Sequence, residues 1–458
     1  MKLKHIFNAC LLGLVLLNAQ SCRKSDSLEV DMDRYKLNIQ GDAEIDAWIA
    51  TNMTSPYNIE LVYRFERSLT DVARDIAPVK LEKVKPTAEA IINIFLKTYE
   101  KVAGASFIRR YTPKQFVLYG SPSYNSNGTI VLGTADGGRR VVLYELNDLN
   151  FSDPAQVSRK MRTIHHEFTH ILNQIIDIQP DFRLVTKSDY NEDWTASANT
   201  AADAQRLGFV SRYARSSFTE DFAEMTAHLL IEGQFWFEAY AKAAGADGQA
   251  KLKKKEALVV DYFRQNFNIN FRELQYEVSK VLTEVYNDQT KSFTYAIRNN
   301  QVTIPFNVAP DDGPHYVEFG QSEKFAEIWQ AVKDSIALSG RKASNFNVVF
   351  LSNTVMQLQQ NYLSSANSPF TAWYDFNVSI NADGDIVFTR FDNGGTEGQY
   401  GNGRIVSVLK GYKPMLDYLE SHVFKADWIP LDAGPKNYLR YGGFYVKDEP
   451  DNYFYGKF

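Results

Sequence analysis

The sequence of 458 residues predicts an α+β fold, in which a mostly helical part with a small mixed sheet precedes a part rich in strands. In the first part, apolar residues recur at helical spacing on both sides of a single cluster of short β-branched runs. In the second part, apolar and polar residues alternate, and Asp383-Gly384 marks a hairpin turn between two such runs. Helices and strands segregated in this way are typical of the α+β class.

The elements of the first part follow one another without an internal repeat. Three strand runs are expected at residues 115–120, 129–133 and 139–146. Asp153-Pro154 is a start signal for a helix that carries three histidines. Four further helices are expected at residues 219–231, 235–244, 248–266 and 271–286. The basic stretch KLKKKEA at residues 251–257 is expected to be a solvated helix face.

The second part begins near residue 289. The run SFTYAIRNNQVTIPFNV is interpreted as alternating strands with a turn at Asn299-Asn300. Ser322 is expected to cap a helix that ends at Gly340. The C-terminal aromatic residues between positions 441 and 455 are expected in a sheet core, with stacking on a sugar or a peptide as the alternative.

The N-terminus has the features of an export signal. Lys2 and Lys4 precede an apolar run at residues 6–17 that is too short to span a bilayer comfortably. The residues around Cys22 resemble a bacterial lipoprotein cleavage site, which implies that Cys22 is the lipid attachment site. The alternative is a plain secretory signal with an unmodified Cys22. Cys10 lies in the part to be removed, so lipidation explains why the mature chain would keep a single cysteine.

These features predict four segments. They are a signal peptide at residues 1–21, a lipid-anchored tether at 22–35, a mostly helical domain at 36–288 and an accessory domain of unknown function at 300–458. The protein is therefore expected in the cell envelope, anchored in the outer membrane by its N-terminal lipid, with the periplasmic or outer face left open. The net charge of −5 and the absence of a long basic run exclude nucleic acid as a partner.

A metal-binding motif lies in the predicted three-histidine helix. His166-Glu167-Phe168-Thr169-His170 is an HExxH sequence. Residues four apart share one face of a helix, so both imidazoles can reach one Zn²⁺ ion. Glu167 would act as the general base on a zinc-activated water. His165 is expected to point away from that face.

A catalytic zinc site needs a third protein ligand. Glu220, Glu224 and His228 recur every four residues on a second predicted helix, and an acidic stripe on a buried helix is costly unless a cation neutralises it. The alternative for Glu220 is a capping box with Ser217. Spacing alone leaves Glu220, Glu224 and His228 as equal candidates for the third ligand.

A family resemblance separates these candidates. HEFTH, Tyr213 and Glu220-Asp221-Phe222-Ala223-Glu224 together resemble the gluzincin arrangement of the anthrax lethal factor class. They are closer still to zinc metallopeptidase lipoproteins of Bacteroidetes that accompany outer-membrane nutrient-import systems. The resemblance implies that residues 36–288 form a zincin-like zinc metallopeptidase domain. It also implies that Glu220 is the third ligand, that Glu224 orients a histidine, and that Tyr213 donates to the oxyanion.

Two main functions follow from these patterns. The first is a lipid-anchored zinc metallopeptidase with one Zn²⁺ per chain, a peptide or protein substrate, and components of an outer-membrane import receptor as possible partners. The second is a nutrient-import accessory lipoprotein that binds a peptide or a glycan and keeps a structural or vestigial zinc site. A hydrolase that acts on another amide, such as one in the cell wall, is a third.

Overall fold

The computed structural model describes residues 42–71, 73–125, 130–131, 133–136, 138–429 and 434–458. The chain divides into two compact units, Met1–Asp46 and Ala47–Phe458, and residues 42–46 are the described part of the first unit. The predicted signal peptide (residues 1–21), the tether (22–35) and the lipid site Cys22 lie outside the described residues.

The fold is α+β, as the sequence predicts. A four-stranded sheet has the order β1-β2-β6-β5, in which β1, β2 and β6 are parallel and β5 runs antiparallel to β6. Its strands are β1 (Glu60–Val62), β2 (Gln115–Leu118), β5 (Gly133–Asp136) and β6 (Arg140–Leu143), and β3 (Ser123–Tyr124) pairs separately with β4 (Ile130–Val131). The central strands β2 and β6 are buried, which explains their continuous apolar sequences.

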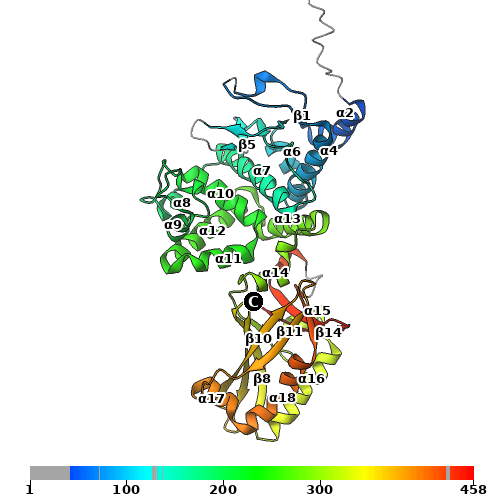
Figure 1. Ribbon diagram of the computed structural model, residues 1–458, viewed down its shortest axis with the longest axis vertical. Coiled ribbons are helices and arrows are strands. Elements are labelled where there is room, and N and C mark those ends of the chain that lie inside the picture. Colours follow the sequence, from blue (N-terminus) through cyan, green and yellow to red (C-terminus); the bar gives the residue numbers. More distant parts are fainter. Residues whose placement is uncertain (1–41, 72, 126–129, 132, 137, 430–433) are drawn as a thin grey trace, which may run out of the picture. The chain divides into compact units, whose positions relative to one another are not determined.

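Most of this part of the chain is helical. Its helices are α2 (Ala43–Ile49), α3 (Ser55–Tyr57), α4 (Leu81–Ala90), α5 (Lys97–Ala103), α6 (Ala105–Tyr111), α7 (Pro154–Ile175), α8 (Pro180–Val185), α9 (Ala201–Arg206), α10 (Phe218–Ile231), α11 (Gln234–Ala243), α12 (Gly245–Phe267), α13 (Phe271–Tyr286) and α14 (Phe293–Arg298). A π-helical segment, Ile91–Leu96, joins α4 to α5. Figure 1 shows α7 packed beside α10 and next to the edge strand β5.

The second part of the chain forms a closed barrel with the strand order β10-β11-β12-β13-β14-β7-β8-β9. Its strands are β7 (Phe306–Val308), β8 (Lys342–Ser352), β9 (Val355–Leu363), β10 (Pro369–Ile380), β11 (Ile386–Phe391), β12 (Val423–Asp427), β13 (Tyr441–Val446) and β14 (Glu449–Lys457). Its helices are α15 (Pro314–Phe319), α16 (Glu323–Ala337), α17 (Gly398–Arg404) and α18 (Val406–Ser421). Gly384 has a positive φ of 80° in the predicted hairpin turn between β10 and β11.

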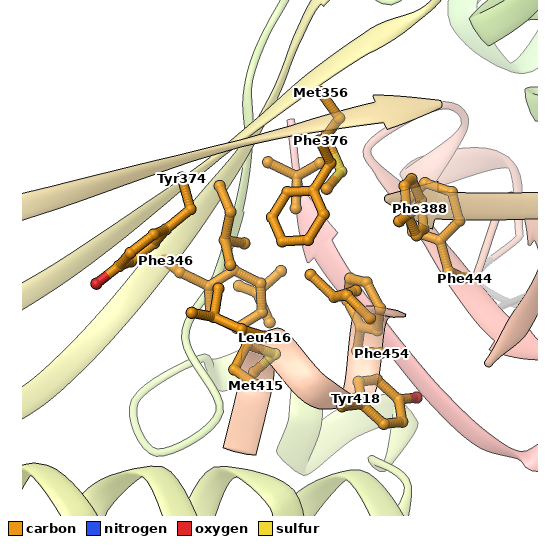
Figure 2. Close-up of a cluster of buried hydrophobic side chains, with 14 of the residues drawn as sticks. Phe346, Met356, Tyr374, Phe376, Phe388, Met415, Leu416, Tyr418, Phe444 and Phe454 are labelled. Carbon is orange, nitrogen blue, oxygen red and sulfur yellow. The ribbon is translucent and has the colours of Figure 1, made fainter. Parts of the chain in front are cut away.

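The core of the barrel lies between its strands and the helices α16 and α18. Figure 2 shows Phe346, Met356 and Phe376 of three neighbouring strands pointing toward Met415 and Leu416 of α18. The C-terminal aromatics also belong here, because Phe444 and Phe454 are buried in the same cluster. The expected role in a sheet core is therefore confirmed for these two residues, whereas Tyr445 and Tyr453 are only partly buried.

Two expectations about local structure are wrong. Residues 293–298, interpreted as a strand, form helix α14, because Ser292 caps this helix by accepting a hydrogen bond from the Tyr295 N–H at 3.1 Å. The stretch at residues 251–257 is not a solvated face throughout, because Lys255 and Glu256 are buried. Both have ionic partners that the local sequence does not show, Asp221 for Lys255 and Arg272 for Glu256.

Within the described residues, each helix is too short or too polar to cross a lipid bilayer.

Candidate metal centre

Two capped helices position the side chains of the centre. α7 begins with Pro154, and the Asp153 carboxylate accepts a hydrogen bond from the Ala155 N–H at 3.0 Å. Helix α10 is capped by Ser217, whose hydroxyl accepts from the Glu220 N–H at 3.2 Å. The predicted capping box is therefore half present, because the Glu220 side chain turns toward the histidines.

The structure brings His166, His170 and Glu220 together. The Nε2 atoms of His166 and His170 lie 3.0 Å apart, and the Glu220 Oε2 lies 3.0 Å from the first and 3.2 Å from the second. This group could hold a metal ion, with one ligand atom from each residue. Atoms bound to a tetrahedral zinc at about 2.0–2.2 Å lie about 3.3 Å apart, so the triangle has nearly the size that zinc requires.

The Glu224 carboxylate takes a different position from that of Glu220. Its Oε1 lies 2.9 Å from Nδ1 of His166, on the opposite side of the imidazole from the triangle. Its Oε2 accepts a hydrogen bond from the Ser211 hydroxyl at 2.6 Å. A carboxylate at Nδ1 keeps the ring proton there and leaves the Nε2 lone pair for a metal.

The electrostatics of the group favour a cation. Burial lowers the pKa of His166, but hydrogen bonds to Glu220 and Glu224 outweigh burial and raise it to about 10. Burial raises the pKa of the Glu220 carboxyl, but its hydrogen bonds to His166 and His170 hold that pKa well below its usual range. Two imidazole nitrogens and a carboxylate oxygen that converge on one point are ligands that a divalent metal such as zinc binds.

A cavity of about 320 Å³ opens next to this group. Glu167 and Tyr213 line it together with His166. The Tyr213 ring stacks on that of His166 with centroids 6.0 Å apart. Burial and the negative charge of Glu220 raise the pKa of Tyr213, so its hydroxyl stays protonated at neutral pH and can donate a hydrogen bond.

A buried ion pair holds the start of α10 in place. Asp221 and Lys255 are both inaccessible to solvent, and their charged atoms lie 2.6 Å apart. The Tyr190 hydroxyl donates to the same Asp221 oxygen at 2.8 Å, and Lys255 donates to the Gly208 carbonyl at 2.8 Å. Because Asp221 follows Glu220 directly, this pair fixes the helical turn that presents Glu220 to the histidines.

The other two histidines of the motifs lie outside the triangle. His165 is fully buried between Phe95 and Tyr99, and neither of its ring nitrogens has a hydrogen-bond partner among the described residues. His228 donates from Nδ1 to the Glu224 carbonyl at 2.9 Å and stacks on Trp236. His228 is therefore not placed as a ligand.

Three further residues of the site were not predicted. Arg162 and Trp194 line the cavity, and Ser211 supports Glu224. Arg162 is four residues before His166, so the helical spacing could have placed it on the same face. Trp194 comes from the long segment between α7 and α10 and packs edge-on against Tyr213. No local signal in the sequence indicates Trp194 or Ser211.

A protein family and a solved structure are similar to this chain. A family model described as "Putative zinc-binding metallo-peptidase" matches residues 39–272, just over half of the chain. The chain is similar to the crystal structure of "a putative zinc-binding metallo-peptidase from Bacteroides caccae ATCC 43185", with 29% identity, 54% of this chain and 95% of that chain covered, and a TM-score of 0.47. No curated protein matches the chain. The residues that match the family model include both α7 and α10.

Proposed function

The chain belongs to the putative zinc-binding metallo-peptidase family, and from this premise we propose that it is a gluzincin-type metallopeptidase with one zinc per chain. The observation that carries the proposal is the triangle of His166, His170 and Glu220, with the carboxylate of Glu167 beside it on the cavity wall. A purely structural zinc site has four protein ligands and no need of a base, whereas a catalytic site keeps one position open.

The chain's own residues supply the steps of hydrolysis. A zinc ion held by the triangle would polarise the scissile carbonyl and lower the pKa of a water molecule. Glu167 takes the proton from the attacking water and delivers it to the leaving amine. Tyr213 donates its hydroxyl proton in a hydrogen bond to the oxyanion of the substrate. Glu224 holds the His166 ring in the required tautomer.

The walls of the cavity suit an extended peptide. Gly133 of the edge strand β5 lines the cavity, and among the described residues β5 pairs on one side only, with β6. A peptide that passes the metal can add to the free edge of such a strand through main-chain hydrogen bonds. Arg162 lines the same cavity and can bind a carbonyl or a carboxylate of the substrate.

The proposal extends to the place where the protein acts. A lipid on Cys22 would hold the enzyme in the cell envelope, in the outer membrane. There its substrate would be a peptide or protein, and components of an import receptor would be its neighbours. This part rests on the sequence features of residues 1–35.

A matched pair of proteins tests the function. We expect the purified wild type to contain about one zinc per chain by mass spectrometry and to cleave at least one substrate in a broad peptide and protein panel. Glu167→Gln should keep the zinc and lose about 10²- to 10⁴-fold in rate, since it removes the base and not a ligand. Zinc-loaded wild type that cleaves nothing would instead support the accessory binding lipoprotein, and an unchanged rate in Glu167→Gln would exclude Glu167 as the base.

A further inference from the structure

One segment of the barrel is nearly free of charge. Residues 343–382 contain one charged residue, Asp375, in a chain in which 23% of residues are charged. These residues form the strands β8, β9 and β10 and their turns. Exposed sheet faces ordinarily carry many Lys and Glu side chains, so a neutral face of this length indicates a surface adapted to a neutral ligand.

The neutral side chains lie together on the outer face of the barrel. Figure 2 shows Phe346, Met356, Tyr374 and Phe376 pointing into the core. Because side chains alternate along a strand, the residues between them face outward. These outward residues, here called the amide face, are Asn345 and Asn347 of β8, Gln357, Gln359 and Asn361 of β9, and Thr371, Trp373 and Asp375 of β10.

The strand register arranges the amide face in rows. Asn345 lies opposite Asn361 and Asn361 opposite Thr371, while Asn347 lies opposite Gln359 and Gln359 opposite Trp373. Hydrogen bonds of 2.7 Å run along the first row, from the Thr371 hydroxyl to the Asn361 Oδ1 and from the Asn361 Nδ2 to the Asn345 Oδ1. The first row is therefore ordered. In the second row, Asn347 accepts from Asn307 and Gln359 donates to Gln357, each at 2.7 Å.

The single carboxylate, Asp375, is buried and accepts three hydrogen bonds from neutral side chains. Asp375 accepts from Gln357 at 3.0 Å, from Asn393 at 2.7 Å and from the Tyr400 hydroxyl at 2.9 Å. Tyr400 also packs edge-on against Trp373, with ring centroids 5.2 Å apart. This end of the amide face is a rigid polar wall with an aromatic ring beside it.

A hollow of about 460 Å³ lies at the other end of the amide face. Asn345, Asn361, Gln399 and Asn402 line it, and no residue of its lining is charged. Phe370 also lines it, is 43% exposed and stacks on Tyr362 with centroids 5.7 Å apart. Phe370 lies opposite Tyr362 in the strand register, on the other face of β10 from Thr371, and the hollow at the start of β10 is lined from both faces. It therefore combines a flat apolar surface with amide donors and acceptors.

We propose that the amide face and this hollow bind a neutral oligosaccharide. Each sugar hydroxyl both donates and accepts a hydrogen bond, as does each Asn and Gln amide, so neighbouring hydroxyls can pair with one amide. The apolar face of a pyranose ring packs on the ring of Phe370 or Trp373. The ligand is uncharged because the hollow beside Phe370 is lined by no charged residue, and the one charged side chain of the amide face, Asp375, is buried.

An extended peptide is the less suitable occupant. Peptides that add to a sheet need a free strand edge. Beside the hollow the edge of β10 is covered by α17, where the Asn402 amide donates to the Thr371 carbonyl at 3.0 Å. The amide face and the hollow contain no residue of the metal centre, so the binding inferred here does not depend on the proposed peptidase activity.

Native gel electrophoresis of the purified protein tests the proposal. The gels would contain one neutral polysaccharide each, namely soluble starch, dextran, yeast mannan, galactomannan or xyloglucan, with polygalacturonate as the acidic comparison. We expect at least one neutral gel to retard the wild type. By titration calorimetry, Gln359→Ala and Phe370→Ala should each weaken that binding about tenfold.

Two controls separate this surface from the rest of the protein. Ser379→Ala changes an exposed outer residue of β10 beyond the amide face and should bind as the wild type does. Glu167→Gln should also bind normally, even though it should lose hydrolysis. Retardation by none of the neutral polysaccharides, retardation by polygalacturonate alone, or equal losses in Ser379→Ala and Gln359→Ala would overturn the proposal. Peptide binding with the same dependence on Gln359 would overturn the assigned ligand class.

Discussion

Replacing Glu224 by alanine should weaken zinc binding without abolishing it, because Glu224 holds a ligand and not the metal. Its Oε1 lies 2.9 Å from Nδ1 of His166, whereas the Glu220 Oε2 lies 3.0 Å from Nε2 of the same ring. Without Glu224, the His166 ring can rotate and can place its proton on Nε2, where the metal should bind.

The magnitudes of the two losses should differ. Removing a group that orients a metal-bound histidine typically costs about 10- to 100-fold in affinity, which is about 1.4–2.7 kcal/mol. Structural zinc sites with four protein ligands are worth about 10–16 kcal/mol, which is about 3 kcal/mol, or more than a hundredfold, for each ligand. Glu220→Ala should therefore lose more affinity than Glu224→Ala.

Competition against a chromophoric zinc chelator measures both dissociation constants. Glu224→Gln is the matched control, and its loss of zinc affinity should lie between those of the wild type and Glu224→Ala. The amide oxygen of the new side chain can still accept a hydrogen bond from His166, while its NH₂ group replaces the oxygen that accepts from Ser211. Circular dichroism would show that each variant is folded. A larger loss in Glu224→Ala than in Glu220→Ala would refute the assignment and make Glu224 the ligand.

Three further predictions concern buried polar groups. Lys255→Met should lower the free energy of unfolding, measured in urea, by about 3–5 kcal/mol, because the buried Asp221 carboxylate loses its partner. The double variant Lys255→Met, Asp221→Asn should recover part of this loss. If it recovers none, the broken ion pair is not the cause of the loss. Burial lowers the pKa of Lys160 to about 8, against an ordinary value of 10.5, although Glu145 opposes this. Between pH 8 and pH 10.5 the Lys160 amine therefore carries its proton in the unfolded chain but not in the folded one. The free energy of unfolding should rise by about 1 kcal/mol from pH 7 to pH 9. The same rise in Lys160→Met would show that Lys160 is not its cause. His165→Leu should leave the zinc content unchanged. It should raise the free energy of unfolding by about 1 kcal/mol, because it removes two buried ring nitrogens that have no hydrogen-bond partner among the described residues. Loss of zinc in this variant would show that His165 has a role at the metal centre.

Elements with strong local signals could be predicted from the sequence. Helix α13 spans Phe271–Tyr286 as expected, and its cap Asn270 accepts from two N–H groups of its first turn. Helices α7 and α10 also match, because their caps and apolar faces are local properties. The six residues of α14 could not be recognised, since so short an apolar run satisfies a strand pattern as well as a helical one.

Other properties depend on partners that are distant in the sequence. Lys255 has the local pattern of a surface lysine, yet it is buried because Asp221, 34 positions earlier, supplies its counter-charge. The amide face likewise requires the register of three strands, which places Gln359 between Asn347 and Trp373. Neither arrangement follows from the periodicity of one segment.

The metal centre shows the same division. The HExxH spacing was enough to place His166 and His170 on one helix face, because an α-helix repeats every 3.6 residues. Glu220 and Glu224 are one turn apart on α10, so their spacing makes both carboxylates equal candidates for the third metal ligand. The packing of α10 on α7 gives the two carboxylates different positions, because it sets Glu220 against Nε2 and Glu224 against Nδ1 of His166.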